Sequence, residues 1–108
     1  MYDKSQLMRG TLEGCILKIL SINTTYGYEI VTRLLEYGFE EIKEGTIYPL
    51  LVRLEKKKII SSELRPSPLG PNRKYYSLTE EGHAYFDEFR DYWKQVSTSV
   101  NQILELEE

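Results

Sequence analysis

The sequence predicts a mainly α-helical domain with one two-stranded β wing. Its apolar residues recur first with a helical period, then alternate, and then return to the helical period. The chain has 108 residues, of which 41% are hydrophobic and 29% charged, which suits one folded domain. Such a small chain is expected to pair with a second copy rather than to enclose a large catalytic pocket. No apolar run approaches the ~20 residues of a membrane span, and no signal peptide is evident, so we expect a cytoplasmic protein without a membrane partner.

Two helices are expected in the first third of the chain. Apolar residues spaced three and four apart predict a helix over residues 5–22. The polar residues 23–25 that follow offer oxygens for an N-cap. A second amphipathic helix is therefore predicted near residues 26–37, and Gly38 is placed to end it.

A third helix is predicted to start between residues 43 and 46 and to end near Lys58. Pro49 would break a helix interior but is tolerated in a first turn, so it places the helix start nearby. This helix is apolar on one side and basic on the other. Its apolar side consists of Ile47, Leu50, Leu51 and Leu54.

The apolar period changes from helical to two after residue 58. Ile60, Ser62 and Leu64 alternate with residues 61, 63 and 65, as in a strand. A second short strand-like run spans residues 73–78. The seven residues between the runs, 66–72, contain three prolines and one glycine. We therefore expect two strands joined by a seven-residue loop that cannot be helical.

The chain is predicted to end in a long helix. Thr79 is placed to cap it, because Glu80 and Glu81 follow at the positive end of the helix dipole. No proline intervenes before about Leu106, so the helix is expected to be roughly 40 Å long. Its apolar residues have the a/d spacing of a short coiled coil. We expect the following residues to form a homodimer seam: Phe86, Phe89, Trp93, Val96, Val100 and Ile103.

Three helices followed by a hairpin is the element order of a winged helix-turn-helix domain. In that arrangement the third helix can enter the major groove of DNA, while the hairpin reaches the backbone beside it. We therefore divide the chain into a winged helix-turn-helix DNA-binding domain, residues 1–78, and a C-terminal dimerisation helix, residues 79–108. The two parts are expected to form one compact unit.

The distribution of charge favours a nucleic-acid partner, although the whole chain has a formal net charge of −3. Residues 43–78 carry eight basic and three acidic residues, whereas the segments on both sides are net negative. Salt screens charges beyond ~8 Å, so a polyanion at the middle segment would be attracted mainly by local positive charge. Charge runs are often only solvated surface. Here, however, the positive segment coincides with the helix and hairpin that would meet DNA.

Three stretches of the sequence resemble the PadR family of bacterial transcriptional regulators. They are YGYE at 26–29, EGTIYPLLVRLE at 44–55 and GPNRKYYSLTEEG at 70–82. The second and third in this order are specific, and the resemblance spans about residues 7–104. It implies a winged-helix DNA-binding domain, dimerisation through the C-terminal helix, and repression relieved by a small molecule. The chain looks like the short subgroup, which has one long terminal helix.

The DNA-binding candidates are hydroxyl and basic side chains on three elements. Hydroxyls suit phosphate oxygens, and a guanidinium can grip guanine or phosphate with two hydrogen bonds. Cations near the tip of the wing are placed to follow phosphates or a neighbouring minor groove. The same side chains could instead pack in the core or coat the surface. The candidates are Tyr26 and Tyr28 on the second helix, Thr46, Tyr48, Arg53 and Lys56 on the third, and Arg73 and Lys74 on the wing.

Trp93 is the candidate effector-binding residue. Two Trp93 rings facing each other across a twofold axis could sandwich a flat aromatic effector, as the resemblance implies for some PadR-like regulators, or they could simply fill the interface. Cys15 is expected to be a small buried residue. The sequence has no phosphate-binding glycine loop, catalytic triad or spaced metal ligands, so we expect no enzyme activity, no metal and no cofactor.

Two alternatives from other functional classes compete with this reading. The winged helix could bind a protein through its acidic terminal helix, or the dimer could bind aromatic ligands without contacting DNA. The protein-binding alternative leaves the positive charge of residues 43–78 unexplained, and the ligand-binding alternative is the weaker of the two. We therefore predict a homodimeric repressor that binds a pseudo-palindromic double-stranded DNA operator and is released by a small aromatic effector.

Overall fold

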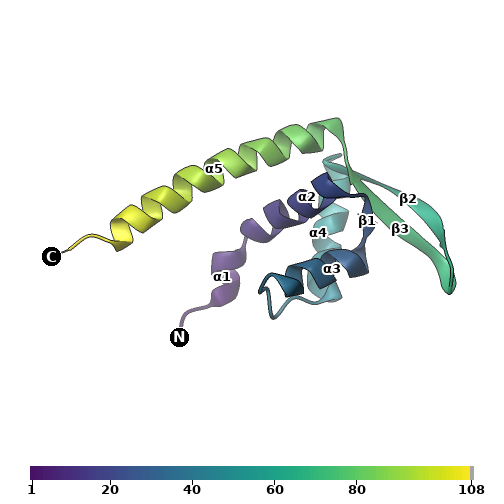
Figure 1. Ribbon diagram of the computed structural model, residues 1–108, viewed down its shortest axis with the longest axis horizontal. Helices are drawn as coiled ribbons and strands as arrows, with labels where there is room; N and C mark the ends of the chain where they lie inside the picture. Colours follow the sequence, from purple (N-terminus) through teal and green to yellow (C-terminus); the bar gives the residue numbers. More distant parts are fainter. Residues whose placement is uncertain (108) are drawn as a thin grey trace.

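The N-terminal segment forms two helices rather than one. In the computed structural model, which describes residues 1–107, α1 spans Lys4–Met8 and α2 spans Thr11–Ile22 (Figure 1). The break lies at Gly10, whose φ of +88° is in the left-handed region that glycine adopts readily. The continuous helix expected over residues 5–22 is therefore wrong at this point.

The next two helices confirm the sequence prediction. α3 spans Gly27–Glu36 and α4 spans Glu44–Lys56. Pro49, however, lies in the second turn of α4 rather than in its first. It has no N–H to donate to the carbonyl of Gly45, four residues earlier. Both residues are exposed, so this carbonyl is open to solvent and the helix accommodates the proline.

The wing belongs to a three-stranded antiparallel sheet in the order β1-β3-β2. β2 spans Ile60–Ser67 and β3 spans Gly70–Leu78, so only two residues separate them. The seven-residue loop expected over 66–72 is therefore wrong, because both strands continue into it. The third strand, β1, spans Thr25–Tyr26 and pairs with Tyr75–Tyr76 of β3. A two-residue strand shows no alternation, which explains why the sequence did not reveal it.

The core lies between α2, α3, α4 and the base of the sheet. α5, Glu80–Leu104, joins this core at its N-terminus. Thr79 caps the helix by accepting a hydrogen bond from the N–H of Gly82 at 2.9 Å. A Cβ at Gly82 would collide with the carbonyl oxygen of Ile59, so glycine lets the helix start against the sheet. The largest fully buried side chains are Ile16, Leu17, Ile30, Ile47, Leu51, Leu54 and Ile60.

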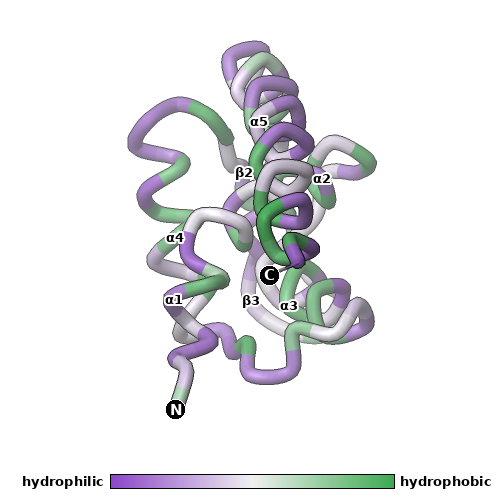
Figure 2. Tube along the Cα trace, turned by 90° about the vertical axis from the view of Figure 1, so that its left-hand side faces the viewer, coloured by the Kyte–Doolittle hydropathy of each residue, from purple (hydrophilic) through white to green (hydrophobic). Residues whose placement is uncertain are grey.

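α5 packs on the domain with its first half and extends beyond it with its second half. Phe86 is buried in the core of its own chain, and the ring of Phe89 occupies the space that a Cβ at Gly14 would need. Farther along, Trp93 and the apolar residues after it are exposed. Figure 1 shows the wing and this second half projecting to different sides of the helices, and Figure 2 shows hydrophobic segments recurring along α5. Within residues 1–107, no helix combines the length and the apolar character that crossing a bilayer requires.

Candidate nucleic-acid interface

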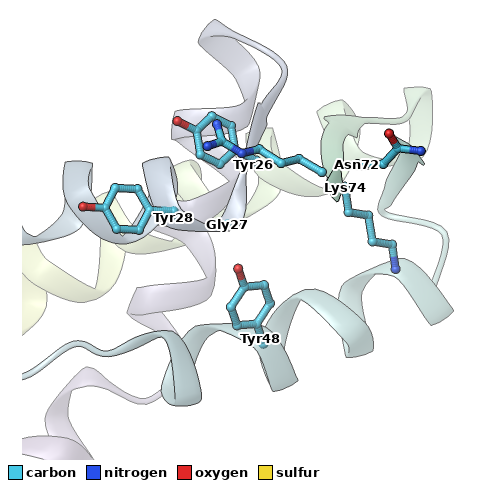
Figure 3. Close-up of a pocket in the computed structure, with 7 residues that line it drawn as sticks. Tyr26, Gly27, Tyr28, Tyr48, Asn72 and Lys74 are labelled. Atoms are coloured by element: carbon cyan, nitrogen blue, oxygen red, sulfur yellow. The ribbon is translucent and has the colours of Figure 1, made fainter. Parts of the chain in front are cut away.

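Five of the eight DNA-binding candidates line one open pocket where α3, α4 and the wing meet (Figure 3). The pocket has a volume of about 440 Å³. Hydroxyl, amide and basic side chains face it, and all of them can donate hydrogen bonds to phosphate oxygens. The lining residues are Tyr26 from β1, Gly27 and Tyr28 from the start of α3, Tyr48 from α4, and Asn72, Arg73 and Lys74 from β3.

Tyr48 crosses from α4 to the start of α3 and lies against the backbone of Gly27. A Cβ on residue 27 would lie only 2.6 Å from the Tyr48 hydroxyl oxygen, so a glycine is required beneath this ring. Tyr48 is nevertheless 39% exposed. Partial burial, and secondarily the charge of Glu44, raises the pKa of its phenol above the usual value. The hydroxyl therefore keeps its proton at neutral pH and can donate it in a hydrogen bond.

Tyr28 is the most exposed tyrosine of the pocket, at 61%. In Figure 3 its hydroxyl points away from Tyr48. Its hydroxyl is therefore open to a partner, whereas that of Tyr48 faces α3.

Two arginines and two tyrosine rings lie together on one face of the sheet. The guanidinium of Arg65 lies 4.8 Å from the centre of the Tyr75 ring, and that of Arg73 lies 4.5 Å from the centre of the Tyr26 ring. The two rings are 5.3 Å apart. The strand register produces this arrangement, because Arg65 pairs with Arg73 and Tyr75 pairs with Tyr26 across the sheet. Each ring attracts the cation beside it. Arg65 is also held by Glu63, whose carboxylate lies 2.6 Å from its guanidinium, whereas Arg73 has only the ring of Tyr26 beside it among these contacts.

Lys74 points to the opposite face of β3 from Arg73, because neighbouring side chains of a strand alternate. Its ammonium lies 3.0 Å from the carboxylate of Glu55 on α4. Glu55 also accepts a hydrogen bond from Ser62. The bond from Ser62, followed by the contact with Lys74, lowers the pKa of Glu55, and the bond to Glu55 raises the pKa of Lys74. Lys74 therefore ties the wing to α4, and its charge is already paired.

Thr46 and Arg53 lie on another side of α4, facing α1 and α2. Both line a separate open pocket with Glu13 of α2. Arg53 donates a hydrogen bond through Nη2 to the Glu13 carboxylate, while 53% of its side chain stays exposed. The sequence analysis missed Glu13, because the pair joins residues 40 positions apart and no local pattern marks it.

Two candidate cations have no acidic partner in the structure. Four ion pairs form within residues 1–107, and neither Arg73 nor Lys56 takes part in one. Lys56 is exposed in the last turn of α4. Arg73 is one of the residues that line the pocket between α3, α4 and the wing, which we call the tyrosine pocket, whereas Lys56 does not line it. The same part of the chain has no cluster of three His, Cys, Asp or Glu residues that could hold a metal ion.

Comparison with known proteins identifies the family of the chain. Residues 16–88 match the PadR-like family of transcriptional regulators. The chain belongs to this family. A PadR-like regulator from Bacillus cereus strain ATCC 14579 is 49% identical, with 94% of this chain and 99% of that chain covered and a TM-score of 0.85. A Streptococcus transcriptional regulator is 47% identical, with 93% and 98% covered and a TM-score of 0.84. An uncharacterized Lysinibacillus sphaericus protein is 34% identical over 105 residues, which are 94% of this chain and 95% of that protein.

Family membership confirms both the resemblance noted in the sequence and the winged-helix fold with a long C-terminal helix. PadR-like proteins are transcriptional regulators, so the chain belongs to a class of DNA-binding regulators rather than of enzymes. In this PadR-like chain, the tyrosine pocket includes residues of α4 and of the wing, which are the helix and the hairpin expected to meet DNA.

Trp93 of this PadR-like chain lies where two apolar grooves meet. One groove, of about 570 Å³, is lined by residues that include Cys15, Phe39 and Phe89. The other, of about 580 Å³, continues past Val96 along α5. Trp93 itself is 48% exposed, so its ring is available to a partner.

Cys15 packs against the core as expected, but it is only half-buried and lines the first of these grooves. Burial raises the pKa of its thiol, which therefore stays protonated at neutral pH. Phe86 also lines this groove, but it is only 7% exposed. Because Phe86 belongs to the core of its own chain, we leave it out of the proposed dimer surface.

Proposed function

We propose that this PadR-like protein is a homodimeric repressor that binds a pseudo-palindromic operator and releases it when a small aromatic effector binds. The observation that carries the DNA-binding part is the tyrosine pocket, which Arg73 lines without an acidic partner among residues 1–107. Hydroxyls and cations at this spacing on α4 and the wing suit one stretch of sugar-phosphate backbone. Such a protein acts in the cytoplasm, where bacterial DNA lies.

The second half of α5 supports the proposed dimer. Trp93, Val96, Val100 and Ile103 are each between 47% and 67% exposed. Burying the exposed half of four such side chains is worth roughly 3–6 kcal/mol per protomer, or roughly 6–12 kcal/mol for both, which is comparable with the ~4–15 kcal/mol that association costs. Leu7 of α1 is also 67% exposed and lines both apolar grooves, so α1 adds to the same surface.

Twofold symmetry then determines the kind of operator. Two copies of α4 related by a twofold axis require half-sites about one helical turn apart, near 34–36 Å. Selection of bound fragments from a random duplex library tests this directly. We expect the enriched fragments to share an inverted repeat with that spacing. If the purified protein binds no duplex even at low ionic strength, the proposed function is wrong.

The effector is proposed to stack on Trp93 at the interface between the subunits. An aromatic molecule there would change how the two α5 helices pack and thereby the distance between the two α4 helices. Trp93 is the only tryptophan of the chain, so its fluorescence reports such binding. We expect flat aromatic compounds to quench it and to release DNA at the same concentrations. Quenching without release would support the ligand-binding alternative and contradict the repressor.

A further inference from the structure

The Glu13 carboxylate connects the helix that faces DNA with the helix proposed to form the dimer. One of its oxygens, Oε2, accepts a hydrogen bond from Arg53 of α4 at 2.5 Å. The other, Oε1, accepts one from the Tyr85 hydroxyl of α5 at 3.2 Å. Only 13% of the Glu13 side chain is exposed, against 53% for Arg53. A nearly buried carboxylate is therefore shared between two partners from different helices.

The position of Arg53 on α4 gives it two directions in which to reach. Val52, Arg53 and Lys56 are all exposed, so this stretch of α4 is open to a partner. The guanidinium can extend toward that partner, or it can reach back to Glu13 as it does in the structure. Ion pairs with an exposed member are weak, so a DNA phosphate can compete with Glu13 for Arg53.

Tyr85 makes this competition depend on α5. Burial, and secondarily the charge of Glu13, raises the pKa of the Tyr85 phenol, which therefore keeps the proton that it donates. One turn farther along α5, the ring of Phe89 packs on Gly14, the residue next to Glu13. Phe89 also lines both apolar grooves beside Trp93. Any shift of α5 at these grooves therefore changes the distance between Tyr85 and Glu13.

We propose that Glu13 is a positioning residue that withholds Arg53 from DNA, and that Tyr85 weakens this hold by sharing the carboxylate. When α5 carries Tyr85 away, Glu13 is left to Arg53 alone, binds it more strongly, and lowers the affinity for DNA. The inference rests on the proposed DNA-binding function. It adds the contact through which a change at the α5 grooves reaches α4.

The test compares variants of the full-length protein for affinity to a duplex obtained by the selection described above. Glu13→Gln removes the competing charge, so we expect it to bind DNA about two- to five-fold more tightly, with a salt dependence steeper by about one phosphate contact. Tyr85→Phe is expected to weaken binding about two-fold. The double variant should bind like Glu13→Gln, because Tyr85 acts only through this carboxylate.

Two controls separate this contact from other effects. Glu88→Gln removes the same charge from the pocket that Glu13 shares with Tyr85, but Glu88 makes no ion pair within the described residues. We expect Glu88→Gln to bind less tightly than Glu13→Gln. In the Arg53→Ala background, Glu13→Gln should have no effect on affinity. Urea unfolding of every variant checks that each is folded.

If Glu13→Gln and Glu88→Gln increase the affinity for DNA equally, the change in net charge alone explains the increase and the inference is overturned. It is also overturned if Tyr85→Phe binds as the wild type does, or if Glu13→Gln weakens binding. These results leave the proposed function intact, because the wild type binds DNA in all of them. A wild type that binds no duplex would overturn both.

Discussion

The guanidinium of Arg73 covers the ring of Tyr26, 4.5 Å from its centre, while the next residue of the strand turns the other way. That residue, Lys74, reaches Glu55 of α4 at 3.0 Å. The two neighbouring cations therefore have different surroundings. One is held by a ring and has no acidic partner within residues 1–107, and the other is neutralised within the domain.

This difference predicts that the two cations contribute unequally to DNA binding. Arg73→Ala is expected to weaken binding to all sequences and to reduce the salt dependence of log Kd by about one phosphate contact. Removing the internal pair together, with Lys74→Met and Glu55→Gln, should leave that slope unchanged, because a paired lysine releases no counterion. Fluorescence anisotropy between 50 and 200 mM salt measures both. A slope reduced equally in both variants would show that Lys74 also contacts phosphate.

The contact between Tyr48 and Gly27 predicts that two glycine substitutions change the stability of the protein by different amounts. Gly27→Ala places a Cβ 2.6 Å from the Tyr48 hydroxyl oxygen, so we expect it to lower the free energy of unfolding by about 1–3 kcal/mol. Gly45→Ala meets nothing within 4 Å and lies in helix α4, so it should be neutral or stabilise by up to about 1 kcal/mol. Urea unfolding at pH 7 tests the two. Similar losses of stability in both variants would mean that the Tyr48 ring moves aside easily to make room for the new Cβ.

The low pKa of Glu55 predicts a pH dependence of stability. Its pKa in the folded protein is lowered first by the hydrogen bond from Ser62 and then by Lys74. Because the folded-state pKa lies below the unfolded one, the stabilisation is fully present above the unfolded value of about 4.3 and is lost as pH falls through the folded value. Ser62→Ala should raise the pKa of Glu55 and make the variant lose less stability than the wild type on acidification. An NMR titration of the Glu55 carboxyl carbon measures the shift directly, and an unchanged pKa would contradict the role of Ser62.

The apolar stripe of α5 predicts which substitution separates the subunits. Val100→Asp places a charge on the surface that the dimer would bury, so we expect monomers at micromolar concentration by analytical ultracentrifugation. Thr98 is exposed and lies on the opposite side of the helix from the grooves, so Thr98→Asp is the matched control and should remain dimeric. A dimeric Val100→Asp variant would move the interface elsewhere.

The periodicity of the sequence predicted the main elements, because burial imposes a helical spacing on α2 to α5 and an alternating one on the wing. Features that have no periodic pattern were not predicted. Gly10 interrupts the apolar pattern by a single residue, and β1 is too short to alternate. The strands of the wing run past Pro66 because the register shifts between Arg65 and Ser67 and accommodates a residue that cannot donate a ladder bond.

The sequence predicted which residues line the site, but not how all of them are arranged. Residue type and element order identified the hydroxyls and cations that line the tyrosine pocket. Neighbouring residues of a strand point to opposite faces, so the sequence was sufficient to predict that Arg73 and Lys74 face opposite ways. The contact of Arg53 with Glu13 could not be predicted from the sequence, because it depends on how α2 packs beside α4.

In the proposed dimer, the uncovered half of α5 makes the stability of the protein depend on its abundance. The apolar side chains that the domain leaves in water would be sheltered only when a second copy is bound, so mass action would raise the melting temperature as the protein concentration increases. A cell with few copies would then hold them in a less stable form, and proteases would degrade the unpaired chains first.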